Sequence, residues 1–438
     1  VCGLFSLRCW VRVSVFLSVS LLSLLLLSIL CPVVYNSFLF PLLSFFLFFF
    51  FCGGLHVCGG AWPLNRMYDY STLVTLLSCT AVFKQSFHPR YNSGPVALKV
   101  TAAPPLPLAL QKRVKEEEEE EGLRDDREGD RERATASLCD GTVHPTLHEA
   151  RVYARVCPHP SIPVFVECIE DAFDTSRFLA KEHHRGVRRL PVLVTQFVKA
   201  ASLDRFFYTF PVLRWSVAVQ VAHQVANVLQ HVHSKGVVYG DLKLPNVLLG
   251  SEGHVWLVDF ASAVIVHGGV AVSEERRVVE VEELARGITF HLRAPELFST
   301  TQTPETEAFL KHPFMVDFWA FGAFLLELLT GRPCLGTFAE RSGKYTRDEL
   351  QAKAMEGCSL AKQRYGGLKG PHNADRVWDA LGDLLAGLIQ RSPEQRLGFR
   401  GGWGDVLQHR FFESVGPDLL EPFPEEYAEE NDELMLGL

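Results

Sequence analysis

A short polar run between two apolar stretches constrains this chain more than any other feature. It reads Tyr-Gly-Asp-Leu-Lys-Leu-Pro-Asn over residues 239–246, and thirteen residues after Asn246 comes Asp259, which begins Asp-Phe-Ala directly after Val255–Val258. The pattern over 236–264 predicts a strand–turn–strand segment. An aspartate, a lysine, an asparagine and a second aspartate in this order on turns indicate a functional site, with a solvated polar hairpin as the alternative.

The order and spacing of these residues resemble the catalytic loop and the metal-binding Asp-Phe-Gly of eukaryotic Ser/Thr protein kinases. The resemblance implies that Asp241 orients the attacking hydroxyl and accepts its proton. It implies that Lys243 offsets the charge that develops on the transferring phosphate of ATP. Asn246 and Asp259 are then the residues that hold Mg²⁺ against the phosphates.

Upstream segments are similar to the ATP-binding elements of the same family. Val96–Val100 resembles the strand whose lysine, here Lys99, pairs with the phosphates and with a glutamate on the next helix. Leu193–Phe197 resembles the hinge that offers backbone groups to adenine, although a plain buried strand would read the same way. The resemblance assigns ATP binding to Lys99, Glu149, Val82, Ala97, Thr195, Gln196, Phe197, Val198 and Leu248.

Downstream motifs favour a protein substrate. Arg-Ala-Pro-Glu at 293–296 matches Ala-Pro-Glu, Asp317 begins Asp-Phe-Trp-Ala-Phe-Gly, and Arg396 follows late in the chain. In the family this arginine pairs with Glu296 and the aspartate braces the catalytic loop, whereas small-molecule kinases lack these elements. Residues 396–423 look like the end of the AGC group, which contains the cyclic-nucleotide-dependent kinases.

The element pattern predicts an α+β chain with a small β-rich lobe that has one main helix, then a larger, mostly helical lobe. The resemblance implies that these are the N-lobe and C-lobe of the two-lobed protein kinase fold. Strand-like runs precede residue 198, with a helix expected over 147–156, and helical spacing dominates afterwards, with a long helix over 215–233. The expected division is a hydrophobic segment 1–66, an N-lobe 67–198 with an acidic disordered insertion 101–142, a C-lobe 199–412 and an acidic tail 413–438.

The N-terminal segment is open to two interpretations. Residues 13–60 contain no Asp, Glu, Lys or Arg, and 13–51 are apolar enough for a membrane anchor. The same Leu, Phe, Ser and Val run is also typical of translated non-coding sequence. We therefore expect a cytoplasmic kinase domain, with membrane anchoring through 13–51 as an open alternative.

Charge and cysteine usage exclude some partners. The net charge of −8 provides no basic footprint, so nucleic acid is not an expected partner. The 11 cysteines form no C-x-x-C pair and indicate neither a zinc site nor a disulfide framework. The expected partner is a protein substrate with a Ser or Thr hydroxyl.

Three departures from the family pattern favour a second hypothesis. The phosphate-covering loop reads Thr-Leu-Leu-Ser-Cys-Thr-Ala-Val over 75–82 and has no glycine, and Ala261 replaces the glycine after Asp-Phe. Gly240 replaces the arginine that reads a phosphorylated activation loop, so activation by loop phosphorylation is not expected. The alternative is a catalytically weak kinase or a pseudokinase that serves as a binding or scaffold module.

Overall fold

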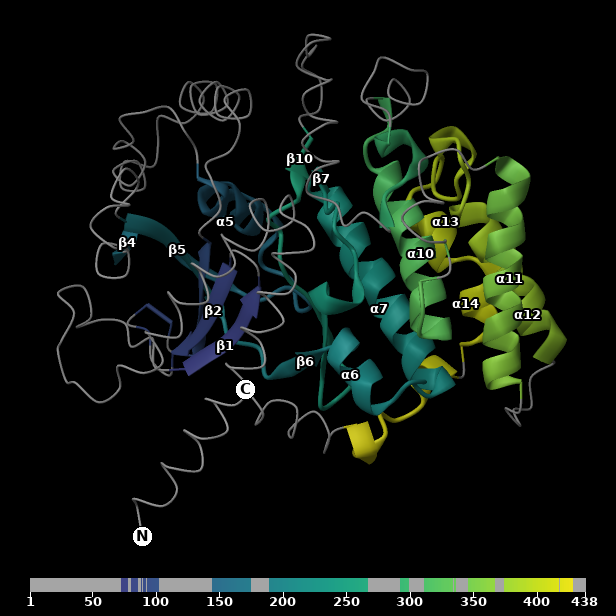
Figure 1. The fold of residues 1–438 in the computed structure, drawn as a ribbon, viewed down its shortest axis with the longest axis horizontal. Helices are drawn as coiled ribbons and strands as arrows, with labels where there is room; N and C mark the ends of the chain where they lie inside the picture. The colour runs from purple at the N-terminus through teal and green to yellow at the C-terminus, as the bar shows by residue number, and fades with distance from the viewer. Residues whose placement is uncertain are drawn as a thin grey trace, which may run out of the picture.

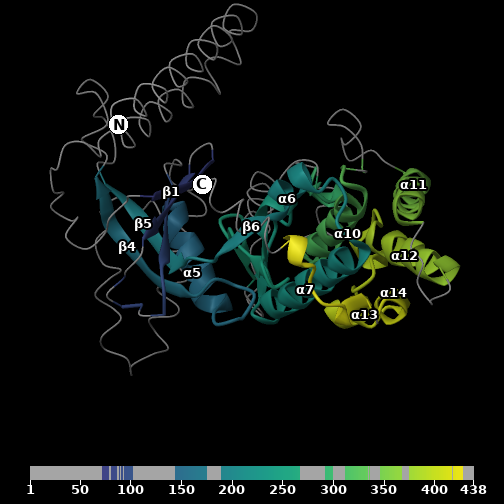
Figure 2. The ribbon, with the colours of Figure 1, turned by 90° about the horizontal axis from the view of Figure 1, so that it is seen from below.

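The strands gather with one helix at one end of the molecule, and most helices lie at the other end (Figures 1 and 2). This computed structural model describes residues 72–77, 80–85, 88, 90–91, 93–101, 144–174, 189–266, 292–298, 311–333, 335, 346–366, 374–416 and 418–427. The expected two-lobed α+β architecture is confirmed.

The smaller lobe is built on a five-stranded antiparallel sheet in the order β1-β2-β3-β5-β4. Its strands are β1 (Thr72–Leu77), β2 (Thr80–Gln85), β3 (Val96–Thr101), β4 (Phe165–Asp174) and β5 (Arg189–Gln196). In the central strand β3, Val96, Leu98 and Val100 are buried and alternate with the half-buried Ala97 and Lys99. Because strand side chains alternate between faces, Lys99 points to the side opposite the most buried residues.

Helix α5 (Pro145–Val156) is the one described helix of this lobe. Proline at its first turn needs no hydrogen-bond acceptor, and the His144 side chain caps the free Thr146 amide at 3.2 Å. Its buried residues recur at helical spacing and include Glu149 together with Val152, Tyr153 and Val156. The helix therefore carries a carboxylate inside its apolar face, which requires a charged partner.

The larger lobe is helical around α7 (Trp215–Ser234) and α10 (Met315–Thr330). Every residue of α10 except Glu327 is buried, and Gly331 ends the helix with a left-handed φ of 66°. The other helices are α6 (Leu203–Thr209), α11 (Arg347–Tyr365), α12 (Ala374–Leu388), α13 (Trp403–Leu407) and α14 (Arg410–Ser414), and the 3₁₀ turns are η5 (Leu244–Asn246), η7 (Pro295–Leu297), η8 (Pro393–Gln395) and η9 (Asp418–Leu420).

Short strands lie where the two lobes meet, between the sheet and the helices in Figure 1. They are β6 (Ala200–Ser202), β7 (Val237–Val238), β8 (Val247–Gly250), β9 (Val255–Leu257) and β10 (Val264–Ile265). β6, β8 and β9 form one sheet, and β7 pairs with β10. These strands fix the ends of the two turns that carry the polar residues singled out in the sequence.

The expected helices over 147–156 and 215–233 are confirmed within one or two residues at each end. β1 and β2 pair as a hairpin although their connection has no glycine. Within the described part of the chain, no helix combines the length and the apolar character needed to cross a bilayer. The candidate anchor 13–51, most of the acidic insertion 101–142 and the loop 267–291 lie outside the described residues.

Candidate active site

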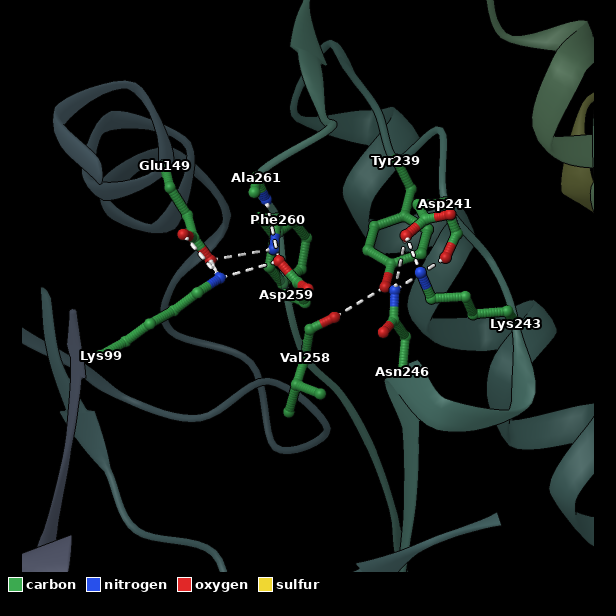
Figure 3. Close-up of polar contacts among 10 residues, drawn as sticks. All are labelled: Lys99, Glu149, Tyr239, Asp241, Lys243, Asn246, Val258, Asp259, Phe260 and Ala261. Atoms are coloured by element: carbon green, nitrogen blue, oxygen red, sulfur yellow. Dashed lines mark hydrogen bonds and ion pairs between the residues drawn. The ribbon is translucent and has the colours of Figure 1, made fainter. Parts of the chain in front are cut away.

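Lys99 brings together two carboxylates that are distant in sequence (Figure 3). Its Nζ donates to both carboxylate oxygens of Glu149 at 2.8 Å and to Oδ1 of Asp259 at 2.8 Å. The three residues come from β3, from α5 and from the turn after β9. This contact therefore ties both lobes together at one cation, as the sequence resemblance implied for Lys99 and Glu149.

The electrostatics of this cluster favour the ionised forms of Lys99 and Asp259, whereas burial raises the pKa of Glu149. Burial acts to lower the pKa of Lys99, but Asp259 and Glu149 outweigh it and raise the pKa above its ordinary value. Burial likewise acts to raise the pKa of Asp259, but the ion pair and hydrogen bond with Lys99 hold it below its ordinary value. Asp259 therefore stays a carboxylate over the physiological pH range.

The turn at Asp259 is strained in a way that aspartate tolerates. Its φ is 61°, and it is the one described non-glycine residue with a positive φ. Ala261 does not share that conformation, so alanine in place of the family's glycine adds no left-handed strain here. The Ala261 amide also donates to Oδ1 of Asp259 at 3.3 Å. The substitution therefore leaves the carboxylate in position.

Phe260 anchors the same turn in the core. Its ring packs edge-on against Tyr153 of α5 at 4.9 Å and against Tyr239 at 5.2 Å, measured between ring centroids. The Phe260 amide donates to Glu149 at 3.2 Å. The turn is thus held inward from both lobes, which keeps Asp259 beside Lys99.

The second polar group lies on the loop between β7 and β8. Nζ of Lys243 donates to Oδ2 of Asp241 at 2.6 Å, and Nδ2 of Asn246 donates to the same oxygen at 3.1 Å and to the Asp241 carbonyl at 2.9 Å. Asp241 is 5% exposed, and these donors help to compensate its charge. Figure 3 shows Asn246 between this aspartate and the turn that carries Asp259.

The backbone just before Asp241 is held by Asp317 from the first turn of α10. The Tyr239 amide donates to Oδ2 at 2.7 Å and the Gly240 amide donates to Oδ1 at 2.8 Å. Gly240 has a φ of 80°, a conformation that glycine adopts freely and that costs other residues about 1 kcal/mol. Glycine at position 240 therefore adopts this left-handed backbone without strain. The family's arginine, which binds a phosphorylated activation loop, has no counterpart at this position.

A fully buried ion pair joins Glu296 to Arg396 in the larger lobe. Arg396 donates through two nitrogens to the two carboxylate oxygens of Glu296, each at 2.6 Å, and also to the Met315 carbonyl at 2.8 Å. Both side chains are 0% exposed. Such a bidentate pair fixes the turn at Glu296 relative to α10 and supplies no catalytic group.

The residues assigned to ATP by resemblance fall in two places. The strand registers pair Val82 with Lys99 and Ala97 with Thr195, so these four side chains share one face of the large sheet. Leu248 lies on β8 in the other lobe, half-buried between two buried neighbours. The arrangement places Val82, Ala97 and Thr195 on the sheet face of Lys99, and Leu248 on a strand of the other lobe.

The chain between the lobes has few free backbone groups. The Gln196 amide donates to the Val164 carbonyl at 2.8 Å, and the Phe197 amide donates to the Pro95 carbonyl at 3.0 Å. Among the described residues, the Val198 amide has no acceptor. Of the segment expected to meet adenine, the Phe197 amide is therefore already used, and the Val198 amide remains for a ligand.

Three contacts near the site were not expected from the sequence. Nζ of Lys84 lies 4.7 Å from the centroid of the Phe197 ring, and the Tyr239 hydroxyl donates to the Val258 carbonyl at 2.6 Å. His233 contacts Asp317 at 2.8 Å. Strand alternation places Lys84 on the same sheet face as Val82, so the contact of Lys84 with Phe197 could have been predicted. The Tyr239–Val258 and His233–Asp317 contacts join segments whose sequence patterns do not indicate that they meet.

The protein kinase domain family matches residues 134–412, more than half of the chain. The match begins after β3, yet the sheet joins β1–β3 to β4 and β5, so the structure extends the domain upstream across the insertion.

Curated relatives are similar over about half of this chain. Serine/threonine-protein kinase AtPK1/AtPK6 of Arabidopsis thaliana is 26% identical over 52% of this chain and 41% of its own length. Protein kinase C zeta type of Oryctolagus cuniculus is 28% identical over 46% of this chain and 29% of its own length. Ribosomal protein S6 kinase alpha-4 of Homo sapiens is 28% identical over 51% of this chain and 25% of its own length.

The chain thus spans less than half the length of these relatives. The family match and the relatives nevertheless agree with the site geometry and with the motifs at the end of the domain. The chain belongs to the protein kinase family, and its resemblance to the AGC group of serine/threonine kinases is confirmed.

Proposed function

We propose that this chain is an ATP- and Mg²⁺-dependent protein kinase that transfers the γ-phosphate of ATP to Ser or Thr hydroxyls of proteins. The observation that carries the proposal is the presence of two charge centres, one that joins the two lobes and one on the loop between β7 and β8. One centre consists of Lys99 with Glu149 and Asp259, and the other consists of Asp241 with Lys243 and Asn246. Phosphate transfer needs both a charge clamp and a positioned base.

The second centre is suited to proton transfer. In the proposed reaction the oxygen of the substrate hydroxyl attacks the γ-phosphorus of ATP, and the bond between that phosphorus and the ADP oxygen breaks. Asp241 accepts the proton of the hydroxyl during this step. Lys243, 2.6 Å from the Asp241 carboxylate, is close enough to donate to the transferring phosphate and to offset its charge. Asn246 donates to the same Asp241 oxygen and to the Asp241 carbonyl, which restricts the orientation of the aspartate.

The first centre is suited to the phosphates and to a divalent cation. Oδ1 of Asp259 meets Lys99 and the Ala261 amide, whereas Oδ2 has no partner among the described residues, and the side chain is 29% exposed. Asn246 turns its nitrogen to Asp241, so its carbonyl oxygen remains for a cation. Oxygen ligands of this kind fit Mg²⁺, which, when bound, neutralises phosphate charge.

A non-catalytic binding module is the second candidate, favoured by the glycine-free hairpin over 75–82. A binding module needs no more than residues that contact the nucleotide. It does not need a catalytic base whose carboxylate is held by two hydrogen-bond donors. Here Asp241, Lys243 and Asn246 are present and in mutual contact. The intact second centre therefore favours turnover over mere binding.

Transfer of labelled phosphate tests the proposal. The purified chain is incubated with γ-labelled ATP and Mg²⁺ and with a basic peptide that contains Ser, Thr or Tyr as its one hydroxyl residue. The proposal expects label in the Ser and Thr peptides, little in the Tyr peptide, and loss of labelling with chelator. ATP binding without labelling of any peptide or protein acceptor would support the binding module instead.

For the compartment we propose that the kinase domain is cytoplasmic, with 13–51 as a candidate membrane anchor. The described cysteines Cys157, Cys168 and Cys358 are free thiols, as expected in a reducing compartment. Carbonate extraction of membranes from cells that express the full chain tests the anchor: retention in the pellet supports it, and release into the supernatant contradicts it.

A further inference from the structure

A chain of hydrogen bonds leads from Trp403 to the loop that carries Asp241. Nε1 of Trp403 donates to Nδ1 of His233 at 2.8 Å, and Nε2 of His233 contacts Oδ2 of Asp317 at 2.8 Å. Asp317 in turn accepts the Tyr239 and Gly240 amides, the two residues immediately before Asp241. Trp403 lies on α13, at a distance of 162 residues in sequence from Asp241.

The indole nitrogen is a donor only, so this contact determines the proton positions on His233. Nδ1 must present its lone pair to Trp403, and the ring proton of the neutral histidine is then on Nε2. That proton faces Asp317, which is 0% exposed. The carboxylate therefore receives three donors at once and is held in one orientation.

The surroundings of Trp403 fix the direction of its N–H. The indole is 3% exposed and stacks on Phe318 with ring centroids 4.3 Å apart and planes 18° apart. His233 is also enclosed by Phe314 and Phe318, at 4.9 and 5.7 Å between centroids. An apolar side chain could fill the same space, but it would leave His233 Nδ1 buried without a donor.

Gly240 is the point where this bracing affects the site. It adopts a φ of 80° and has no side chain to restrict the backbone next to Asp241. The described contacts that restrain its amide come from Asp317. Loosening of Asp317 would therefore widen the range of Asp241 positions without removing any group that touches ATP.

We propose that Trp403 is a positioning residue for the catalytic loop, acting through the His233 tautomer and the Asp317 carboxylate. The inference rests on the proposed kinase function for its kinetic part. Its structural part concerns proton positions and backbone restraint and can be measured without any turnover.

Trp403→Phe is the informative variant because it retains a stacked ring and removes the N–H. We expect kcat for peptide phosphorylation to fall about tenfold, the effect of losing roughly one buried hydrogen bond. KM for ATP should stay within twofold, since the nucleotide contacts are unchanged. The matched control is Trp319→Phe, which removes a buried indole N–H that has no partner among the described residues, and kcat should change less than twofold.

Two further measurements distinguish failure of this inference from failure of the kinase assignment. Hydrogen exchange of the Tyr239 and Gly240 amides should be about tenfold faster in Trp403→Phe than in wild type and in the control. In wild type at pH 8, ¹⁵N spectra of labelled histidine should show His233 protonated on Nε2 and accepting on Nδ1. A proton on Nδ1 overturns the proposal even if the variant does not fold. Unchanged exchange, or equal kcat losses in both variants, also overturns it.

Discussion

At the scale of single residues, Lys99 determines the state of the nucleotide side of the site. It binds Glu149 and Asp259 at once, each at 2.8 Å, and its own side chain is 14% exposed. A buried cation between two carboxylates is favourable only while all three are present. Removal of one partner leaves a buried charge uncompensated, so substitutions here affect both nucleotide binding and local stability.

Lys99→Met and Asp259→Asn should each reduce phosphate transfer at least a hundredfold, because they remove the charges proposed to contact phosphates and metal. Circular dichroism should show an unchanged fold at 20 °C. The matched control is Lys362→Met on α11, whose ion pair with Asp375 is exposed. Activity above a tenth of wild type in both site variants would contradict the assigned roles.

Glu327 is a second residue whose environment has a measurable consequence. Burial and the nearby Asp204 raise its pKa from 4.5 to about 7. Below pH 4.5 the Glu327 carboxyl is protonated in both the folded and the unfolded chain, so its burial as a charged group does not lower the stability of the fold. As the pH rises from 4.5 to 7 the unfolded chain loses it first, and stability falls.

Glu327→Gln removes this penalty. We expect the variant to be more stable than wild type by roughly 2 kcal/mol above pH 7, since one pKa unit corresponds to about 1.4 kcal/mol and the side chain is partly exposed. Near pH 4.5 the two proteins should be equally stable. Urea titrations at pH 4.5, 6 and 8 measure the difference; a gap that does not grow with pH would contradict the assigned cause.

At the scale of elements, the segment after α14 is part of the helical lobe. Tyr427 is 1% exposed. Its ring packs edge-on against Phe206 of α6 and against Phe210, the residue that follows α6. Its hydroxyl accepts the Arg214 amide at 2.8 Å, just before α7 begins. The expected boundary between the C-lobe and the tail, at residue 412, therefore separates residues that pack together in the structure.

Tyr427→Phe should lower the free energy of unfolding by about 1 kcal/mol, because the Arg214 amide loses its part-buried hydroxyl acceptor while the ring is retained. The melting temperature should fall by roughly 2–5 °C for a domain of this size. Tyr208→Phe is the control, since Tyr208 on α6 is 86% exposed. Equal melting temperatures for both variants would mean that the tail does not dock as described.

The sequence predicted local elements well because their signals are local. The helix ending at Val156 and the polar turns around Asp241 and Asp259 follow from periodicity and from the spacing of a known family. Tyr427 gave no signal, since one aromatic residue in an acidic stretch has no periodic partner. The contact of His233 with Trp403 also had none, because 170 residues separate them and only the tertiary fold brings them together.

At the scale of the whole molecule, the smaller lobe is held together by strands that are distant in sequence. The sheet order β1-β2-β3-β5-β4 places β3 beside β5 although most of the acidic insertion and all of α5 lie between them in sequence. The register of β3 with β5 is continuous from Val96 to Val100. This continuous pairing holds the strand that carries Lys99; residues 102–142 of the expected acidic insertion lie outside the described part of the chain.

Deletion of 104–136 should leave the melting temperature within about 2 °C of wild type, because its Glu, Arg and Asp block cannot bury apolar area and loop entropy changes slowly with length. Phosphate transfer should persist within about twofold, since the strands on both sides keep their pairing. Thermal unfolding and the peptide assay check both points. A large loss of stability would show that the segment packs against the domain.

The most direct test of the proposed function is the comparison of wild type with Asp241→Asn in steady-state phosphate transfer and in ATP titration. A residue that accepts a proton in the transition state contributes about a hundredfold to ten-thousandfold to the rate and little to nucleotide binding. The predicted result is a kcat at least a hundredfold lower with a Kd for ATP within about twofold, while the exposed control Asp375→Asn changes neither. A kcat within tenfold of wild type would contradict the assignment of Asp241 as the base. Absence of transfer by the wild type itself would contradict the kinase function.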